Sequence, residues 1–214
     1  AIAFNKVDPE HRFRGLRRIN LDHGSCKPLN ERLALDFLRE RVGLNAECAN
    51  NARLEINGSY YGLYTNIEHV DREFLERNFD DPDGNLYEDG RAEWKKTNES
   101  DPDTSDIDEF NAPGSLENLE AIADLDQALR MWAAEAILPG CDNYWYFGRN
   151  FYVYNDPGAG FVYIPTDYDN AIPLGWCSDW MRMPSGERTA SLVLHDPEWR
   201  EKFVRELEAT HARF

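Results

Sequence analysis

The sequence predicts an α+β fold, in which a hairpin-based N-terminal part is followed by helices arranged around a second hairpin. Asn57-Gly58, the strongest short signal for a hairpin, separates two strand-like segments. The turn sequence NDPGAG joins two further segments, NFYVY and FVYI, that are rich in aromatic and β-branched residues. Amphipathic helical patterns lie between and after these hairpins.

Apolar periodicity and turn residues predict the elements of the first half of the chain. Asn30 is placed to cap a helix, and Gly43 is placed to end it. In order, we expect the end of a strand at residues 1–4, a strand at 13–21, a helix at 31–42, strands at 52–56 and 60–67, and a short helix from residue 71.

The second half is predicted in the same way. Asp196 and Pro197 form the start signal of a final helix, as N-cap and first helical residue. Before it, we expect short strands at 86–87 and 92–97, a loop at 98–115, a helical segment from 116, a central helix at 126–138, and hairpin strands at 150–154 and 161–164.

Length and composition indicate one globular domain and exclude several classes of protein. A chain of 214 residues can bury a sizeable core without disulfide staples. Forty acidic and 23 basic residues give a net charge of −17, which repels nucleic acid phosphates and anionic lipid. No apolar run approaches the ~18 residues that a membrane span requires. We therefore expect no nucleic-acid partner and no membrane span.

The four cysteines, Cys26, Cys48, Cys141 and Cys177, lie far apart and form no CxxC pair, which does not resemble a zinc site. Disulfides Cys26–Cys48 and Cys141–Cys177 would close the shortest loops, and four buried free thiols are the alternative. This cysteine usage favours an exported protein.

Polar residues gather at the open end of the second hairpin. Asn150 opens its first strand, and Asp167 and Asp169 follow its second strand. Because a hairpin brings its open ends together, we expect Asn150 and Asp167 to be neighbours, with the loop that holds Asp142 reaching the same end. Phosphoryl transfer needs at least one carboxylate that accepts a proton, and an Asn and an Asp that bind hard cations such as Mg²⁺. Alternatively, Asp142 forms an Asx turn, and Asp167 and Asp169 cap the next segment.

Several ordered motifs resemble the CotH kinase family, atypical kinases similar to spore coat protein H. The N-terminal motifs are FRGLRRINLDHG, the helix LNERLALDFLRERVGL and the hairpin NGSYYGLYTNIEHVD, followed by DGNLYEDG and the strand KKTN. Asp142, RNFYVY and IPTDYD resemble the catalytic half of the family, and DPEWREKF resembles its C-terminal helix. The resemblance covers nearly the whole chain.

This resemblance implies a divergent, reduced protein-kinase-like fold with a hairpin-rich N-terminal lobe and a helical C-terminal lobe that carries a catalytic hairpin. We expect a single domain over residues 1–214, truncated at its N-terminus, with an N-lobe-like part at 1–97 and a C-lobe-like part at 116–214. The implied activity is phosphorylation of Ser or Thr in secreted, surface or spore-coat proteins, with ATP and Mg²⁺ or Mn²⁺. The expected location is extracellular, on the cell surface or in the spore coat, with any signal segment absent from the chain.

The resemblance also implies roles for individual residues. Asp142 matches the catalytic-loop Asp, and Asn150 matches the metal- or phosphate-contacting Asn that follows it. Asp167 and Asp169 match the metal-binding pair of the family's IPWD-x-D motif. Glu68 matches the Glu of the GLY-x-x-x-E-x-VD motif, which would orient a phosphate-binding Lys as the Lys–Glu pair of ordinary kinases does.

Departures from the family pattern bear on this expectation. Thr166 stands where Trp is usual, Ala171-Ile172-Pro173 stands where Phe-Gly is usual, and a KKS-like basic strand is missing. A nucleotide-binding Lys would be lost with that strand. Lys96 is a candidate to replace this lysine in nucleotide binding. Alternatively, Lys96 is an ordinary exposed lysine. Arg18 could reach phosphates, or could equally pair with carboxylates.

Three functions stay open on the sequence. The first is the kinase, which the presence of Asp142, Asn150 and Asp167 favours. The second is a non-catalytic surface or structural module for adhesion or coat assembly, which Thr166, the missing strand and the acidic surface favour. The third keeps the nucleotide site but transfers another group, such as AMP or an amino acid. The sequence indicates neither the protein substrate nor the oligomeric state.

Overall fold

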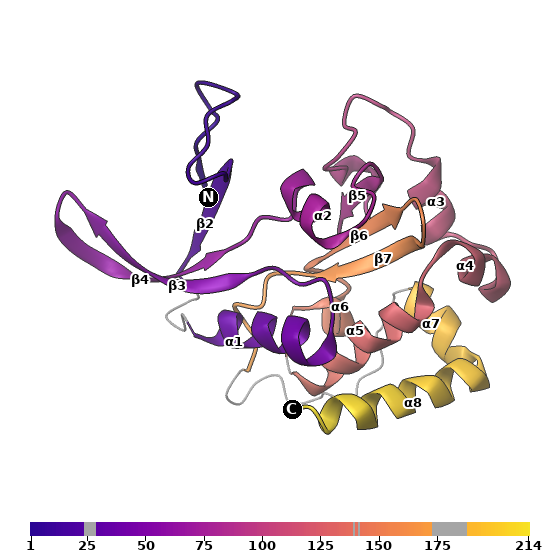
Figure 1. The fold of residues 1–214 in the computed structure, drawn as a ribbon. Coiled ribbons are helices and arrows are strands. Elements are labelled where there is room, and N and C mark those ends of the chain that lie inside the picture. The colour runs from indigo at the N-terminus through magenta and orange to yellow at the C-terminus, as the bar shows by residue number, and fades with distance from the viewer. Residues whose placement is uncertain (24–28, 139, 141, 173–187) are drawn as a thin grey trace.

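The computed structural model describes residues 1–23, 29–138, 140, 142–172 and 188–214 (Figure 1). Cys26, Cys141 and Cys177 lie outside these residues, so the expected disulfide pairs are not described. Cys48 is a free, exposed cysteine. Within the described parts, no helix combines the length and the apolar character needed to cross a membrane.

The N-terminal part of the chain is built on a four-stranded antiparallel sheet. Its strands are β1 (Ile2–Ala3), β2 (Arg18–Asp22), β3 (Ala49–Ile56) and β4 (Ser59–Ile67), in the order β1-β2-β4-β3. The predicted hairpin of β3 and β4 is confirmed, and Asn57 and Gly58 in its turn have φ angles of 51° and 79°. The expected strand at 13–21 begins late, because a tight turn with Gly15 at φ 86° precedes β2.

One helical segment packs against this sheet and shows where a predicted cap was wrong. Helix α1 (Asn30–Asp36) continues into the π-helix η2 (Phe37–Val42), which ends at Gly43 with φ 80° as expected. Leu29, rather than Asn30, occupies the N-cap position. The Asn30 side chain instead donates a hydrogen bond to the carbonyl oxygen of Ala171 at 2.9 Å, which ties α1 to the segment after the second hairpin.

The second sheet is antiparallel and carries the second predicted hairpin. Its strands are β5 (Asn85–Glu88), β6 (Phe151–Asp156) and β7 (Gly160–Pro165), in the order β5-β6-β7. The remaining helices are α2 (Arg72–Asn78), η3 (Ala92–Trp94), α3 (Ser105–Asn111), α4 (Leu116–Ile122), α5 (Leu125–Ile137), α6 (Tyr144–Phe147), α7 (Arg188–His195) and α8 (Pro197–His211). Antiparallel sheets with separate helices make this an α+β fold.

Two predictions for the second half were wrong. Residues 92–97 are not a strand: η3 starts there, and only a single bridge joins Lys95 to Tyr87. The expected loop at 98–115 contains α3, because Ile107 and Phe110 lie one helical turn apart and are both buried. By contrast, Asp196 caps α8 as expected, and the short helix expected from Asp71 is confirmed as α2, with Asp71 as its N-cap.

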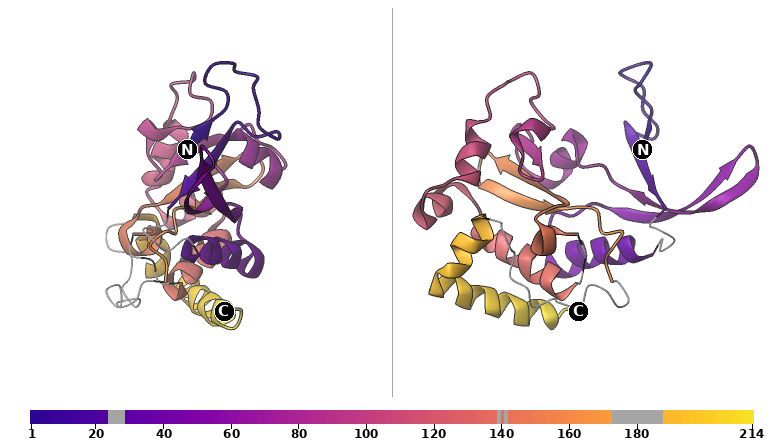
Figure 2. Two further views of the ribbon diagram at one scale, coloured as in Figure 1. Left: turned by 90° about the vertical axis from the view of Figure 1, so that its left-hand side faces the viewer. Right: turned by 180° about the vertical axis from the view of Figure 1, so that it is seen from behind.

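The second sheet is buried on both faces. Phe151, Val153, Phe161 and Tyr163 belong to the main hydrophobic core with α5, whereas Tyr152, Tyr154, Val162 and Ile164 pack with α2. Helix α5 itself lies between this sheet and α8 (Figures 1 and 2). Its Trp132 is fully buried and stacks on Tyr144 with ring centroids 5.8 Å apart. The open end of the β6–β7 hairpin therefore projects from a well-packed platform.

Candidate functional site

Asp142 and Asn150 are held together at the open end of the β6–β7 hairpin. The Asn150 side chain donates from Nδ2 to the main-chain oxygen of Asp142 at 3.1 Å. The side chain of Asn170, which lies just after β7, donates to Asp142 Oδ2 at 3.0 Å. These two amides fix both the main chain and the carboxylate of the Asp142 loop.

The hairpin also brings Asn150 beside Asp167. The main-chain N–H of Thr166 donates to the carbonyl oxygen of Asn150 at 3.2 Å, so Asp167 follows directly. Asn150 and Asp167 have φ angles of 60° and 58°. Asp89, at φ 49°, accepts the main-chain N–H of Asn150 at 2.8 Å. Asn and Asp are the side-chain-bearing residues that tolerate this left-handed region best.

Three further acidic residues, which the sequence reasoning missed, join this site from the N-terminal part. Asp22 ends β2, Glu31 lies in the first turn of α1, and Glu47 precedes β3. Carboxylate oxygens of Asp22, Glu31 and Asp167 lie within 4.8 Å of one another. The sequence did contain an indication that Glu31 is buried. Glu31 and Leu35 are four residues apart and therefore lie on the same, buried face of α1. An acid on an apolar helix face needs a partner.

The acids raise one another's pKa values. Burial raises the pKa of Glu31 to about 8, with further contributions from Asp22 and Asp167. Although Asp167 is an exposed residue, partial burial of its carboxyl and then the charges of Asp169 and Asp142 raise its pKa to about 6. Burial also raises the pKa of Glu47, despite the 2.8 Å hydrogen bond from the Thr166 hydroxyl. Protons or a cation must therefore offset this negative charge.

A buried glutamate links the two loops of the site. The hydroxyl of Tyr168, between Asp167 and Asp169, donates to Glu135 Oε1 at 2.5 Å. The main-chain N–H of Trp145 donates to Glu135 Oε2 at 2.8 Å. Because α6 begins just after Asp142, Glu135 connects the segment with Asp167 to the segment with Asp142 from the core helix α5.

Glu68 does not join the acidic site, because the strand register places it on the other face of the first sheet. Asp22 lies opposite Thr65, and Leu21 lies opposite Asn66. Directly opposite residues of antiparallel strands share a face, and neighbours along a strand alternate. Glu68, two residues after Asn66, therefore lies on the face opposite to that of Asp22.

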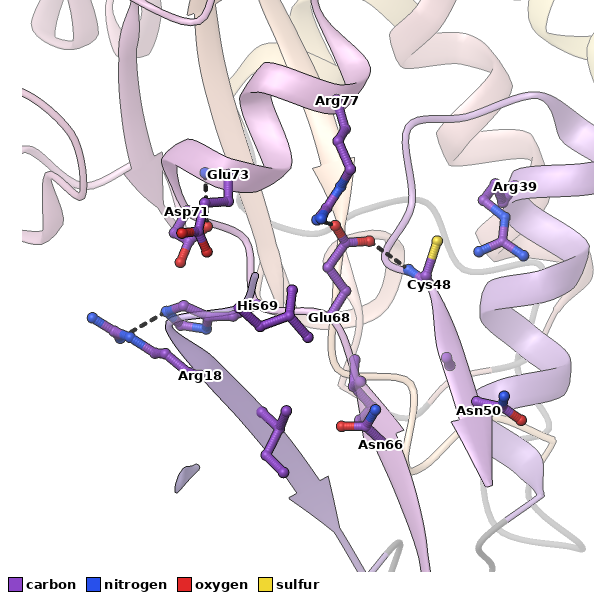
Figure 3. A pocket seen from close by; sticks show the side chains of 14 residues that line it. Arg18, Arg39, Cys48, Asn50, Asn66, Glu68, His69, Asp71, Glu73 and Arg77 are labelled. Atoms are coloured by element: carbon purple, nitrogen blue, oxygen red, sulfur yellow. Dashed lines mark hydrogen bonds and ion pairs between the residues drawn. The ribbon is translucent and has the colours of Figure 1, made fainter. Parts of the chain in front are cut away.

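Figure 3 shows Glu68 in a cavity of about 440 Å³ between the sheet and α2. Its Oε1 forms an ion pair with Arg77 of α2. Its Oε2 accepts the main-chain N–H of Cys48 at 3.0 Å. The cation beside Glu68 in the structure is thus an arginine, whereas the resemblance implied a lysine.

Lys96 and Arg18 lie near His69. Lys96 Nζ pairs with Glu88 Oε2 at 2.5 Å, and Arg18 Nη1 is 2.9 Å from His69 Nε2. Burial, followed by the charges of Arg18 and Lys96, lowers the pKa of His69. Asn20, between Arg18 and Asp22 on β2, contacts His69 Nδ1 at 3.4 Å. The two cations therefore lie beside the acidic site rather than in it.

A comparison with protein families decides which family this site belongs to. The family model described as CotH kinase protein matches residues 2–214, almost the whole chain. The chain belongs to the CotH kinase family. A search of the curated proteins found no match. Membership of the CotH kinase family indicates a kinase-like function, for which ATP and a divalent metal are the expected cofactors.

The acidic site fits the metal expected of a CotH kinase family member. Its donors are carboxylate and amide oxygens, which Mg²⁺ and Mn²⁺ prefer. Oε2 of Glu31 is buried and has no hydrogen-bond partner among the described residues, so it is available to a cation. Asp22, Glu31, Glu47 and Asp167 line one cavity of about 280 Å³. Asp142 does not line this cavity, but it lies close enough to Asp167 for its charge to raise the pKa of that carboxyl.

Proposed function

We propose that this protein is an ATP- and divalent-metal-dependent kinase that phosphorylates Ser or Thr side chains of proteins. The observation that carries the proposal is the convergence of Asp142, Asn150 and Asp167 at the open end of the β6–β7 hairpin. We infer that the two sheets with their helices correspond to the two lobes of a reduced protein-kinase-like fold, with the acidic site between them.

Asp142 is the group proposed to accept the proton of the attacking hydroxyl. Its Oδ2 is held by Asn170, and its main chain is held by Asn150, so the carboxylate is positioned before substrate arrives. Bound ATP would supply the γ-phosphoryl group and leave as ADP, and a bound divalent cation would supply positive charge that offsets the charge of the phosphates. Asp167 and Asp169 are proposed to hold that cation, with Asn150 beside them.

Arg18 and Lys96 support the nucleotide part of the proposal. Arg18, Asn20 and Asp22 alternate along β2, so their side chains share one face of the sheet. The cationic end, at Arg18 with Lys96 nearby, also borders the cavity that holds Glu68 and His69, and the acidic end, at Asp22, lines the acidic cavity. Phosphates complement the first end and a divalent cation complements the second. Glu68, which lines the same cavity as Arg18, is proposed to have a structural role through its ion pair with Arg77.

The substrate and its location are proposed from the family resemblance and from cysteine usage. We propose a secreted, cell-surface or spore-coat protein as the substrate, and the same location for this chain. A net charge of −17 favours substrate segments whose Ser or Thr is flanked by Lys or Arg.

Phosphoryl transfer from γ-labelled ATP tests the proposal. The purified chain is incubated with Mn²⁺ or Mg²⁺ and a basic Ser/Thr-rich protein, and label on hydroxyl oxygens is measured. We expect Asp142→Asn to reduce transfer by about 10² to 10⁴-fold, because a positioned general base contributes that much. ATP affinity, measured by calorimetry, should persist in this variant because Asp142 is not a proposed metal ligand.

Asp156→Asn is the matched control, since Asp156 lies at the closed end of the same hairpin and caps its turn. It should transfer phosphate at the wild-type rate. Wild-type transfer by Asp142→Asn would refute the role of Asp142. ATP binding without any transfer by the wild-type chain would favour the non-catalytic module.

A further inference from the structure

Three carboxylates from three separate elements meet in the acidic cavity. Asp22 comes from β2, Glu31 from the first turn of α1, and Asp167 from the segment after β7. One oxygen of each lies within 4.8 Å of the other two. Like charges at this separation repel strongly, most of all where burial removes water. The arrangement is therefore stabilised by a proton on one carboxyl group or by a cation between the oxygens.

Glu31 supplies a second, independent indication of a ligand. Only 1% of this residue is exposed, and its Oε2 has no hydrogen-bond partner among the described residues. A buried polar atom without a partner costs roughly 1–3 kcal/mol. Glu31 also lines the cavity of about 280 Å³, together with Asp22 and Asp167. The unpartnered oxygen thus borders a space that can hold an ion.

Two arginines near the acidic cavity, Arg18 and Arg32, have contacts elsewhere. Arg32, the next residue of α1, pairs with Asp36 at 3.4 Å and donates to Asn51 at 2.9 Å. Arg18 contacts His69. Within the described residues, no ion pair includes Glu31 or Asp167. An external cation is therefore a better candidate for the cavity than Arg18 or Arg32.

The donors define the class of cation. All three ligands are carboxylate oxygens, which select hard divalent ions over zinc or copper. An ion that binds two oxygens at about 2.1 to 2.4 Å separates them by at most about 4.2 to 4.8 Å. The oxygen spacing of 4.8 Å or less is compatible with a single shared ion.

We propose that Asp22 and Glu31, together with Asp167, bind a divalent cation of the Mg²⁺ or Mn²⁺ type, so that the metal joins the first sheet and α1 to the end of β7. The inference rests on the proposed function only in taking Asp167 as a metal ligand. It goes further in assigning two ligands from the N-terminal part. It also requires that the metal bind without nucleotide, because all three ligands belong to the protein.

Direct metal binding tests this proposal without using activity. Free Mn²⁺ is titrated with the purified chain in the absence of nucleotide and measured by electron paramagnetic resonance. We expect Glu31→Gln and Asp22→Asn to weaken Mn²⁺ binding by at least tenfold. Glu40→Gln is the matched control, because it makes the same change at an exposed position of the same helical segment, and its affinity should equal that of the wild type.

Thermal unfolding with and without Mn²⁺ provides a second readout that also verifies folding. Mn²⁺ should raise the Tm of the wild type and of Glu40→Gln, and should not raise that of Glu31→Gln. Without metal, Glu31→Gln should unfold at no lower a temperature than the wild type, because glutamine is the uncharged isostere of a protonated glutamic acid. Equal Mn²⁺ affinity of Glu31→Gln and the wild type, or no binding by the wild type, would overturn the proposal.

The two proposals fail in different ways. Mn²⁺ binding that depends on Glu31, without phosphoryl transfer, leaves the metal site in place and refutes the kinase. Phosphoryl transfer with Mn²⁺ affinity insensitive to Glu31 and Asp22 supports the kinase and refutes the three-carboxylate site.

Discussion

The two long hairpins of this protein have similar local signals and opposite surroundings. β3–β4 and β6–β7 each consist of two strands joined by a tight, polar, glycine-containing turn. The β6–β7 strands are almost entirely buried, and Val153 and Ile164 are fully so. The β3–β4 hairpin projects from the body (Figure 1), and 57% of Tyr60 and 64% of Tyr61 are exposed near its tip.

This difference shows why the candidate site lies where it does. Catalytic side chains must be held to within a fraction of an ångström, and packed strands hold them better than projecting ones. The site occupies the open end of the hairpin that is covered on both faces. The β3–β4 hairpin contributes only its base, where Ile67 and Thr65 are buried.

Truncating one aromatic residue in each hairpin should give the largest difference in the free energy of unfolding between the two hairpins. Phe161 is 2% exposed and packs on Phe110 with ring centroids 4.5 Å apart, so Phe161→Ala should lower the free energy of unfolding by about 3–5 kcal/mol. Tyr61→Ala at the exposed tip should change it by less than about 0.5 kcal/mol. Urea unfolding monitored by tryptophan fluorescence measures both. Equal effects would mean that the two hairpins contribute equally to the core.

The next largest effect is the pH dependence caused by Glu135, which supports the open end of β6–β7. Burial raises its folded-state pKa from 4.5 to about 7. Between about pH 4.5 and pH 7, the folded protein therefore keeps a proton on Glu135 that the unfolded chain releases. The contribution of this proton to the free energy of unfolding is complete below about pH 4.5 and is lost as the pH rises through about 7. At about 1.4 kcal/mol per pKa unit, the loss is roughly 3 kcal/mol.

Glu135→Gln is the variant that isolates this contribution. Its stability deficit relative to the wild type should be greatest near pH 5 and should shrink toward pH 8, because Gln does not titrate. Urea unfolding at pH 5, 6, 7 and 8 measures the difference. Parallel curves for the two proteins would show that Glu135 has the same pKa in the folded and unfolded states.

The smallest effect is expected from the turn of the projecting hairpin. Gly58 has φ 79°, and a Cβ there would meet no atom within 4 Å, so Gly58→Ala adds only backbone strain. We expect a loss of about 1–2 kcal/mol in the free energy of unfolding. Mn²⁺ affinity should equal that of the wild type. A weakened metal site in this variant would show that the hairpin tip is coupled to the site.

The sequence predicts the parts of this fold that depend on neighbouring residues. Asn57-Gly58 predicts its hairpin, and Asp71 and Asp196 predict their helix starts, because turns and caps are formed within a few residues. Asn150 and Asp167 are neighbours because hairpin strands must meet at their open end.

Contacts between distant segments account for what the sequence did not predict. Asp22 and Glu47 join the site only through contacts with the segment after β7, where Glu47 accepts a hydrogen bond from Thr166 and Asp22 lies near Asp167, and neither carries a local signal. Helix α3 was missed because Ile107 and Phe110 are too few to mark a helix in an acidic segment, although their burial stabilises one. Asn30 was misassigned as a cap because its side chain binds Ala171, which is far away in the chain.

The left-handed backbone at Asp89, Asn150 and Asp167 has a practical consequence for the engineering of this protein. At these positions alanine scanning would not separate a loss of activity from a loss of stability, because alanine removes the side-chain functional group and also strains the backbone. Glycine removes the functional group while accepting the backbone conformation. In a saturation library, glycine variants of Asn150 and Asp167 should therefore strain the backbone less than the alanine variants. Asp167→Gly is the cleaner reference of the two, because the Asn150 side chain also holds the main chain of Asp142.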